Sequence, residues 1–312
     1  MLNITAKYRD LPGSNLPGSN LPGRHAGMAL VSNGVAGPHP PAPTDGIRNP
    51  GRRSRPPAGW HGVDWACELV GTSILVFVGL SAVVMDFGKG SPIASTVPSH
   101  SARLLLTGLV FAGSGALVAI SPIGRRSGAH LNPSITLAFW CRRHLSLGDL
   151  AGYVTSQFLG AVAGTEALRA VWGSRAVSVR FGATLPGHGL QPWQAMLVEA
   201  AMTALLVVAI FAFVSSERTA RWTPLAVWIV VAILVWQGAP YTGTSLNSAR
   251  SFGPAFVAEY WNDYWIYLAG PLTGAVVAAA LWAFVPRATL TAKLFHDVRY
   301  QSVLASELPV KQ

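Results

Sequence analysis

Residues 242–255 read TGTSLNSARSFGPA, and residues 127–136 read SGAHLNPSIT. Both stretches place Leu-Asn after an irregular run of small residues and before a short helix pattern. Asn is a favoured helix N-cap, and Pro133 stands where a first-turn proline is common. Both stretches lie among segments apolar enough to span a bilayer, where unwound backbone is tolerated only if it is buried in protein or lines a cavity. Two such breaks in corresponding halves of a chain predict a site near the membrane midplane of a channel or transporter.

The composition is typical of a polytopic membrane protein. Of 312 residues, 51% are hydrophobic and 12% are charged. The net charge is +10, but the basic residues lie at the ends of apolar segments and in the tails. That placement indicates membrane orientation and contact with anionic lipid, and we expect no nucleic-acid partner. Cys67 and Cys141 lie in or beside apolar segments and are expected to be free thiols.

Six segments are each close to the roughly 20 apolar residues that cross a hydrocarbon core of about 30 Å. They are Asp64–Met85, Ala102–Pro122, Leu147–Trp172, Trp193–Val214, Thr223–Gln237 and Tyr260–Val285. Two shorter helices, Pro133–Arg142 and Ser248–Ala258, are expected between the second and third spans and between the fifth and sixth. Ten helical residues cover only about 15 Å, so the two short helices are expected to meet end to end as half-helices.

The two halves of the chain repeat weakly. CELVGT at residues 67–72 in the first span resembles VEAAMT at residues 198–203 in the fourth. Three spans and a half-helix form an odd-numbered unit, so the second copy enters the membrane inverted. The predicted fold is therefore an all-α membrane protein with six transmembrane helices and two re-entrant half-helices arranged as an inverted repeat. With both termini on the inner side, most basic residues that flank the spans also lie there, as the positive-inside rule requires.

The chain divides into three regions. Residues 1–59 are rich in Pro, Gly and Ser, repeat Leu-Pro-Gly-Ser-Asn, and are expected to form a disordered tail. Residues 60–286 are expected to form the transmembrane channel domain. Residues 287–312 form a polar cytoplasmic tail, in which Leu290, Leu294 and Val298 predict a short interfacial helix.

The two quoted stretches resemble the Asn-Pro-Ala signature loops of the major intrinsic proteins, the family of aquaporins and glycerol facilitators. The resemblance extends over roughly residues 60–286. It implies passive conduction of water or small uncharged solutes, such as glycerol-like molecules or neutral metalloid acids. It also implies a homotetramer with one pore per subunit in the cell membrane, both termini in the cytoplasm, no cofactor and no enzymatic activity.

The motif residues implied by this resemblance centre on two asparagines. They are Asn132, Pro133, Ser134, Asn247, Ser248 and Ala249. Each asparagine is expected to cap its half-helix and to offer an amide donor to molecules in the pore. The half-helix N-termini carry roughly half a positive charge each, which would interrupt a proton-conducting water chain and repel cations. A single Asn before a helix is usually an ordinary cap, but two in matched halves favour a pore.

Two positions depart from the family motif. Ser134 replaces alanine and is expected to add a hydroxyl near the pore. Ser248 replaces proline and loses the preset helical φ, at an expected cost of about 0.4–1 kcal/mol.

Four positions match the family's constriction. Arg250 corresponds to the constriction arginine, Thr244 to the loop position and Val235 to the fifth-span position, where water-selective members usually carry histidine. For the second-span position we expect Leu109, with Ala112 as the alternative, since a short insertion before the first motif obscures the register. Such a ring is less polar than a water-only filter and favours a broader range of small neutral solutes. The alternative for Arg250 is an interfacial arginine that extends its charge to the membrane surface.

Backbone carbonyls of both loops are expected to form a ladder of acceptors along one pore wall. The residues are Gly128, Ala129, His130, Gly243, Thr244 and Ser245. The His130 ring itself is expected to be buried and structural. We expect no metal site, because no carboxylate or second histidine stands at metal-ligand spacing.

Glu68 and Glu199 are acidic residues inside predicted spans, where a charged side chain is energetically unfavourable unless it has partners or a function. In the resembled family such glutamates brace the motif loops by accepting backbone N–H bonds, and Gln157 is expected to pack against a loop. The alternatives are a proton-coupled secondary transporter that uses Glu68 or Glu199, or a non-conducting structural membrane protein.

Overall fold

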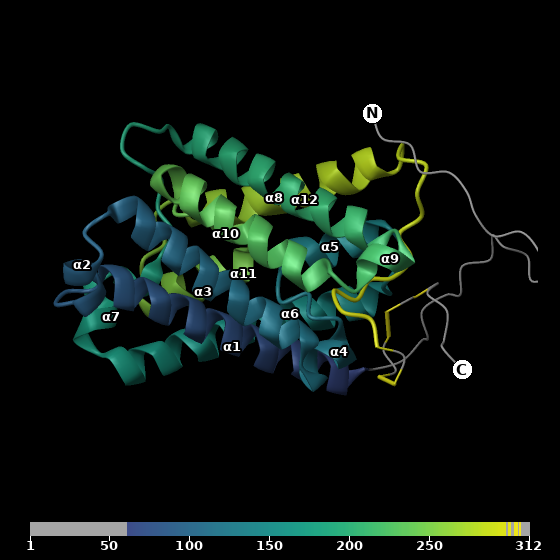
Figure 1. Cartoon of the computed structure of the whole chain (residues 1–312), viewed down its shortest axis with the longest axis horizontal. Helices are drawn as coiled ribbons and strands as arrows, with labels where there is room; N and C mark the ends of the chain where they lie inside the picture. Colours follow the sequence, from purple (N-terminus) through teal and green to yellow (C-terminus); the bar gives the residue numbers. More distant parts are fainter. Residues whose placement is uncertain (1–60, 298, 301–302, 305, 307–312) are drawn as a thin grey trace, which may run out of the picture. The chain divides into compact units, whose positions relative to one another are not determined.

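The computed structural model describes residues 61–297, 299–300, 303–304 and 306. The predicted disordered tail at residues 1–59 lies outside the described residues, as does Val298. The long helices are α1 (Gly62–Phe87), α3 (His100–Ile120), α6 (Leu147–Trp172), α8 (Pro192–Val214), α10 (Thr223–Thr242) and α12 (Tyr264–Trp282) (Figure 1). The short helices are α2 (Pro92–Thr96), α4 (Pro122–Ser127), α5 (Pro133–Cys141), α7 (Ser174–Ser178), the 3₁₀ turn Arg180–Gly182, α9 (Glu217–Ala220) and α11 (Ser248–Val257).

The six long helices correspond to the six predicted spans. Five of them, α1, α3, α8, α10 and α12, are long and apolar enough to cross a membrane. The sixth, α6, has 26 residues but carries charged side chains near both ends, including Asp149 and Arg169. The fifth span is longer than predicted, because α10 continues through Pro240 to a left-handed C-cap at Gly243.

The two half-helices are α5 and α11. Each begins at an asparagine, Asn132 or Asn247, whose side chain accepts the first backbone N–H groups of the helix. Both half-helices contact α6 and α12, and the two also contact each other. The predicted fold, with two re-entrant half-helices among six spans, is confirmed.

Small residues bring the long helices together in the same way in both halves. A Cβ on Gly160 of α6 would lie 2.3 Å from the carbonyl oxygen of Leu69 in α1. A Cβ on Gly274 of α12 would lie 2.2 Å from the carbonyl oxygen of Ala200 in α8. Close backbone packing of this kind is how membrane helices associate, since lipid removes the hydrophobic drive between them.

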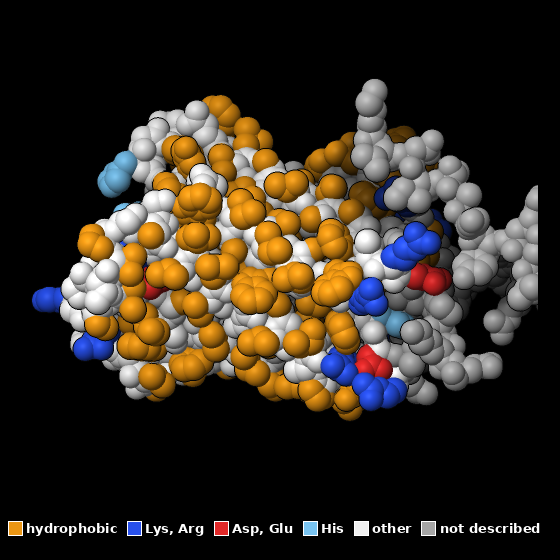
Figure 2. Space-filling model, viewed as in Figure 1, with side chains coloured by type: hydrophobic (Ala, Val, Ile, Leu, Met, Phe, Trp, Pro, Cys, Tyr) orange, Lys and Arg blue, Asp and Glu red, His pale blue; other side chains and the backbone are white. Residues whose placement is uncertain are grey.

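The surface has the character of a membrane-embedded body. Hydrophobic side chains cover the middle of the face seen in Figure 2, and charged side chains gather toward the two ends. Exposed large side chains include Leu117, Leu205, Ile229 and Leu281 from four different long helices. An apolar surface of this extent is favourable in contact with the hydrocarbon of a membrane and is not expected on a protein surrounded by water.

The C-terminal segment differs from the prediction. Residues 287–297 form an irregular segment, so the predicted interfacial helix is wrong in this described part of the chain. Leu294, expected on a membrane surface, is buried. The apolar spacing of Leu290 and Leu294 therefore reflects contacts with the helical body.

Candidate pore

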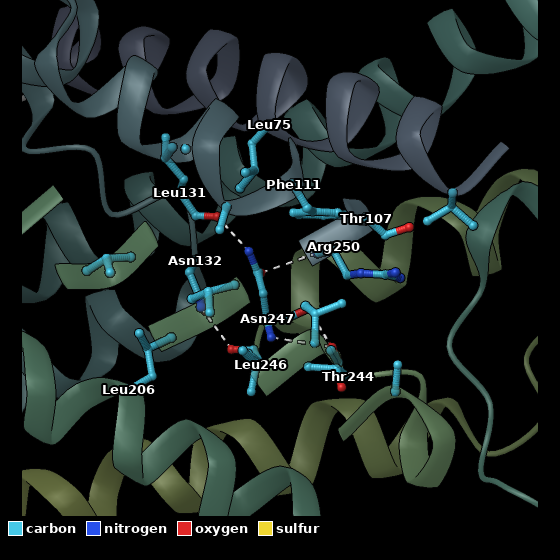
Figure 3. Close-up of a pocket in the computed structure, with 18 of the residues that line it drawn as sticks. Leu75, Thr107, Phe111, Leu131, Asn132, Leu206, Thr244, Leu246, Asn247 and Arg250 are labelled. Atoms are coloured by element: carbon cyan, nitrogen blue, oxygen red, sulfur yellow. Dashed lines mark hydrogen bonds between the residues drawn. The ribbon is translucent and has the colours of Figure 1, made fainter. Parts of the chain in front are cut away.

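The two motif loops are joined by a reciprocal pair of hydrogen bonds. Asn132 Nδ2 donates to the carbonyl of Leu246 at 2.8 Å, and Asn247 Nδ2 donates to the carbonyl of Leu131 at 2.8 Å (Figure 3). The Oδ1 atoms meanwhile accept the cap bonds of their own helices. Each amide has two hydrogens, so one on each asparagine remains to donate toward the cavity that both residues line.

The loops adopt an unusual backbone that recurs in both halves. Non-glycine residues have positive φ angles at Ala129 (55°) and Leu131 (51°), and again at Thr244 (49°) and Leu246 (56°). Left-handed backbone is unfavourable for such residues and persists only where the surroundings over-determine it. In these loops the positive φ angles keep the backbone carbonyls from pointing along a helix axis, so the carbonyls are not used in helical hydrogen bonds.

Buried glutamates hold these loops. Glu68 accepts hydrogen bonds from Ser127 Oγ (2.7 Å) and from the backbone N–H groups of His130 (3.1 Å) and Leu131 (2.7 Å). In the second half of the chain, Glu199 likewise accepts hydrogen bonds from one side-chain hydroxyl and two consecutive backbone N–H groups. Its donors are Thr242 Oγ1 (2.7 Å), Ser245 N (2.8 Å) and Leu246 N (2.9 Å). The carboxylates thus satisfy backbone donors that no helix can satisfy.

Two tyrosines complete the bracing, and the sequence reasoning missed them. Tyr153 donates from its hydroxyl to the carbonyl of Ser127 at 2.7 Å, and Tyr267 donates to the carbonyl of Thr242 at 2.9 Å. Tyr153 lies on α6, 21 residues after Asn132, and Tyr267 lies on α12, 20 residues after Asn247. This similar spacing from the preceding motif asparagine was the available signal. Gln157, one turn after Tyr153, donates to Glu68 Oε2 at 2.8 Å.

The ring of His130 is buried and held on both sides. Nδ1 lies 3.2 Å from Thr136 Oγ1, and Nε2 lies 2.9 Å from the carbonyl oxygen of Ala292. The ring stacks on Phe139 with centroids 5.0 Å apart. This geometry fixes the ring as a strut between the first loop and the C-terminal segment.

A cavity of about 350 Å³ passes between these loops. Its lining includes Phe87 and His100 toward one end and Leu294 toward the other. Asn132 and Asn247 also line the cavity, and Figure 3 shows them near the centre of the lining residues drawn there. Most of the remaining lining is apolar, so a molecule inside has a small number of fixed polar partners.

Three of the four predicted constriction residues line this cavity: Val235, Thr244 and Arg250. Arg250 is 6% exposed and donates from Nη1 to the carbonyl of Gly182 at 2.9 Å. Its guanidinium also lies 5.4 Å from the centroid of the Phe111 ring. An arginine this well buried is not an interfacial arginine that reaches toward the membrane surface.

The prediction of Leu109 at the second-span position is wrong. Leu109 is 39% exposed and lies outside the described lining. Thr107 and Phe111 of the same helix line the cavity, and both lie near Arg250 in Figure 3. The alternative, Ala112, also lines the cavity. Because a helix turns about 100° per residue, an error of two positions moves a side chain to almost the opposite face.

Thr107 is oriented by a buried acid. Its Oγ1 donates to Asp86 Oδ2 at 2.5 Å, and both side chains are buried. The hydroxyl has one hydrogen, which this bond uses, so the oxygen presents lone pairs to the cavity. Thr244 behaves alike, since its Oγ1 donates to the carbonyl of Leu234 at 3.3 Å.

The other motif residues support the loops from outside the cavity lining. Pro133, Ser134, Ser248 and Ala249 are buried but lie outside the described lining. The hydroxyls of Ser134 and Ser248 have no hydrogen-bond partner among the described residues. The expectation that Ser134 adds a hydroxyl to the pore is therefore wrong.

The predicted carbonyl ladder is modified at one position. Ala129, His130, Gly243, Thr244 and Ser245 line the cavity. Gly128 lies outside the described lining, and its carbonyl accepts a hydrogen bond from Leu294 N at 3.0 Å. The Gly128 carbonyl is therefore bonded to the C-terminal segment and is not part of the acceptor ladder.

The fold and the cavity define a polytopic α-helical membrane channel with two re-entrant half-helices. The family model described as Major intrinsic protein matches residues 63–282. The chain belongs to the major intrinsic protein family.

Individual relatives agree with this assignment. The chain is 35% identical over 233 residues to Aquaporin-4 of Mus musculus, covering 72% of this chain and 67% of that protein. It is 32% identical to Aquaporin AqpM of Methanothermobacter marburgensis, covering 70% of this chain and 95% of that protein. Among solved structures, the aquaglyceroporin from Plasmodium falciparum superposes with a TM-score of 0.62 at 19% identity, covering 72% of this chain and 96% of that one. This last similarity shows the shared fold.

Proposed function

We propose that this passive channel conducts water together with small uncharged solutes that carry hydroxyl or amide groups, and excludes ions and protons. The observation that carries the proposal is the cavity that runs past Arg250 and between Asn132 and Asn247. Solutes there exchange hydration for a few fixed hydrogen bonds. The free-energy cost of losing hydration is smaller for neutral molecules than for ions.

The proposed filter consists of Thr107, Val235, Thr244 and Arg250. Arg250 supplies donors, and the two threonine oxygens supply acceptors because their hydrogens are engaged elsewhere. Val235 supplies an apolar wall. A polyol has hydroxyls that need both donors and acceptors along one edge and C–H groups along the other, which suits this ring. Histidine is absent at position 235, which favours a wider ring than a filter for water alone.

Ion exclusion is assigned to the two half-helices and to Arg250. The N-termini of α5 and α11 carry partial positive charge, and Arg250 adds a full charge. The remaining amide hydrogens of Asn132 and Asn247 fix the orientation of a water at that point, which interrupts a proton-conducting chain.

The two alternatives receive less support. Glu68 and Glu199 are fully buried, lie outside the described lining and accept three or more hydrogen bonds each. A carboxylate so engaged is poorly placed to exchange protons with a passing substrate. A non-conducting structural role would leave the polar lining of the cavity without a purpose.

We further propose a homotetramer in the cell membrane with both termini in the cytoplasm. The exposed apolar side chains of the long helices support membrane embedding. Basic residues of the loops around α4, α5 and α9, such as Arg125, Arg143 and Arg218, support assigning that end to the inner side.

The decisive measurement is stopped-flow light scattering of proteoliposomes under osmotic gradients of an impermeant sugar, glycerol and urea. Faster water flow than in empty liposomes, together with measurable glycerol or urea entry, is expected. Rates equal to those of empty liposomes for all three, in the unsubstituted protein and in its Leu294→Ala variant alike, would refute the proposal.

A further inference from the structure

The C-terminal segment crosses the end of the cavity that lies near α4. We call residues 287–297 with Val303 and Leu304 the C-terminal cover. It leaves α12, and Leu290 N donates to the carbonyl of Val214 at the end of α8 (3.1 Å). Further along, the carbonyl of Ala292 accepts from His130 Nε2, and Leu294 N donates to the carbonyl of Gly128. The cover is therefore bonded to the first motif loop itself.

Two leucines of the cover pack against the first motif loop, and one of them lines the cavity. Leu294 is 5% exposed and lines the cavity. Leu304 lies outside the described lining and packs on the loop itself, where a Cβ on Gly128 would lie 2.4 Å from Leu304 Cδ1. Gly128 has a φ of 93°, so glycine is favoured there both by conformation and by this contact.

Polar anchors hold the cover to the helical body. Lys293 Nζ donates to the carbonyl of Arg125 in α4 (3.0 Å) and, within the C-terminal segment, to the carbonyl of Tyr300 (2.6 Å), two bonds that the neutral amine also makes. The Asp64 carboxylate, buried at the start of α1, accepts from Val303 N at 3.2 Å and pairs with Arg126. These anchors join the cover to α1 and α4, more than 160 residues away in sequence.

The position of Leu294 has a direct consequence for conduction. Leu294 N bonds to the carbonyl of Gly128, the first acceptor predicted for the ladder, and the Leu294 side chain lines the cavity. The cover replaces that acceptor with an apolar side chain. Water in a narrow apolar site lacks hydrogen-bond partners, and such constrictions close pores by dewetting.

We propose that the C-terminal cover is an autoinhibitory plug that closes the inner end of the pore, and that the channel conducts faster when the cover leaves. This inference rests on the proposed function, since a plug requires a conducting pore. Departure would break contacts made by an irregular segment and would leave α1–α12 and both motif loops folded. The bracing of the first loop by Glu68, Gln157 and Tyr153 does not depend on the cover.

The test uses the full chain in proteoliposomes with two variants that weaken the plug, Leu294→Ala and Leu304→Ala. The first removes side-chain atoms from the cavity lining, and the second weakens packing on Gly128. The matched control is Leu290→Ala, the same substitution in the same segment at a half-buried residue outside the described lining. Size-exclusion chromatography of each solubilised variant checks that it is folded.

Water permeability is expected to rise on the order of tenfold in either plug variant, because loss of a buried leucine shifts docking equilibria by at least that factor. The control is expected to match the unsubstituted protein. If the unsubstituted protein conducts and both plug variants conduct equally well, the plug is refuted and the proposed function stands. If all four proteins behave like empty liposomes, the proposed function fails and the plug fails with it.

Discussion

Thr107 and Asp86 form a hydrogen bond of 2.5 Å between the side chain of a proposed filter residue and a buried acid behind it. Asp86 belongs to α1 and Thr107 to α3, so the bond fixes the filter across two spans. Because the carboxylate only accepts, it determines that Thr107 presents an acceptor to the cavity. The charge of Arg250 and the lone pairs of Thr107 then face the same solute.

Substitution at this pair is expected to alter solute selectivity. Asp86→Asn places an amide that can donate as well as accept beside Thr107, so the hydroxyl is no longer forced to donate to residue 86. Thr107→Val removes the hydroxyl. One net hydrogen bond is worth about 0.5–1.5 kcal/mol, so glycerol permeability should fall about two- to tenfold while water permeability changes less. Stopped-flow assays of both single variants and of the double variant provide the measurement.

The double variant separates orientation from general damage. If Asp86 acts through Thr107, Asp86→Asn has little additional effect on the glycerol-to-water ratio when Val occupies position 107. Two independent, additive effects would argue that Asp86 has a different role.

Glu199→Gln is expected to loosen the second loop. The glutamine keeps one acceptor oxygen but directs an amide group at donors such as Ser245 N and Leu246 N. Unsatisfied buried donors cost about 1–3 kcal/mol, so the thermal unfolding temperature and the water permeability should both fall. Solute flux of the unsubstituted protein should be the same with and without a proton gradient. A clear dependence on that gradient would instead favour the coupled-transporter alternative.

Substitution of either motif serine, Ser134 or Ser248, is expected to stabilise the protein. Their buried hydroxyls lack partners among the described residues, and Pro133 shows that proline fits the first position of α5. Ser134→Ala and Ser248→Pro should each raise the free energy of unfolding by about 1 kcal/mol. Thermal unfolding in detergent, followed by circular dichroism, measures this change.

A matched control for the serine variants is Ser251→Ala. The Ser251 hydroxyl pairs with Ser245 Oγ at 2.6 Å and with Thr184 Oγ1 at 2.8 Å. Its removal should destabilise the protein, opposite in sign to Ser134→Ala. Equal effects of the two Ser→Ala changes would contradict the partner analysis.

Docking of the cover is expected to depend on pH through Lys293. Burial lowers the pKa of Lys293 from 10.5 to about 8, although Asp64 and Asp297 favour the charged form and Arg126 opposes it. A lowered pKa means that the proton favours the undocked state. The penalty is complete below about pH 8 and disappears as the pH rises toward 10.5, so docking strengthens and water permeability falls over that window. Lys293→Met should flatten this part of the pH profile, and an unchanged slope in that variant would assign the dependence to another group.

Much of the fold was predictable because its signals are local. Apolar length identifies a span, and Asn before a short helix identifies a cap, whatever the rest of the chain does. The paired acids Glu68 and Glu199 were also visible, since a buried charge in a span needs partners. The C-terminal helix prediction failed because Leu290 and Leu294 contact the helical body, which no periodicity reveals.

The sequence by itself determined the spans and the two capped half-helices, because apolar length and an asparagine before a short helix are local signals. Through the family resemblance it also pointed to Arg250, Thr244 and Val235, and all three line the cavity. The tertiary structure alone decided that Leu109 lies outside the cavity lining while Thr107, Phe111 and Ala112 of the same helix line it, since α4 lies between α3 and the first loop and obscures the helical register. It also decided that Leu294 enters the cavity and takes the Gly128 carbonyl, because residues so distant in sequence are brought together only by packing.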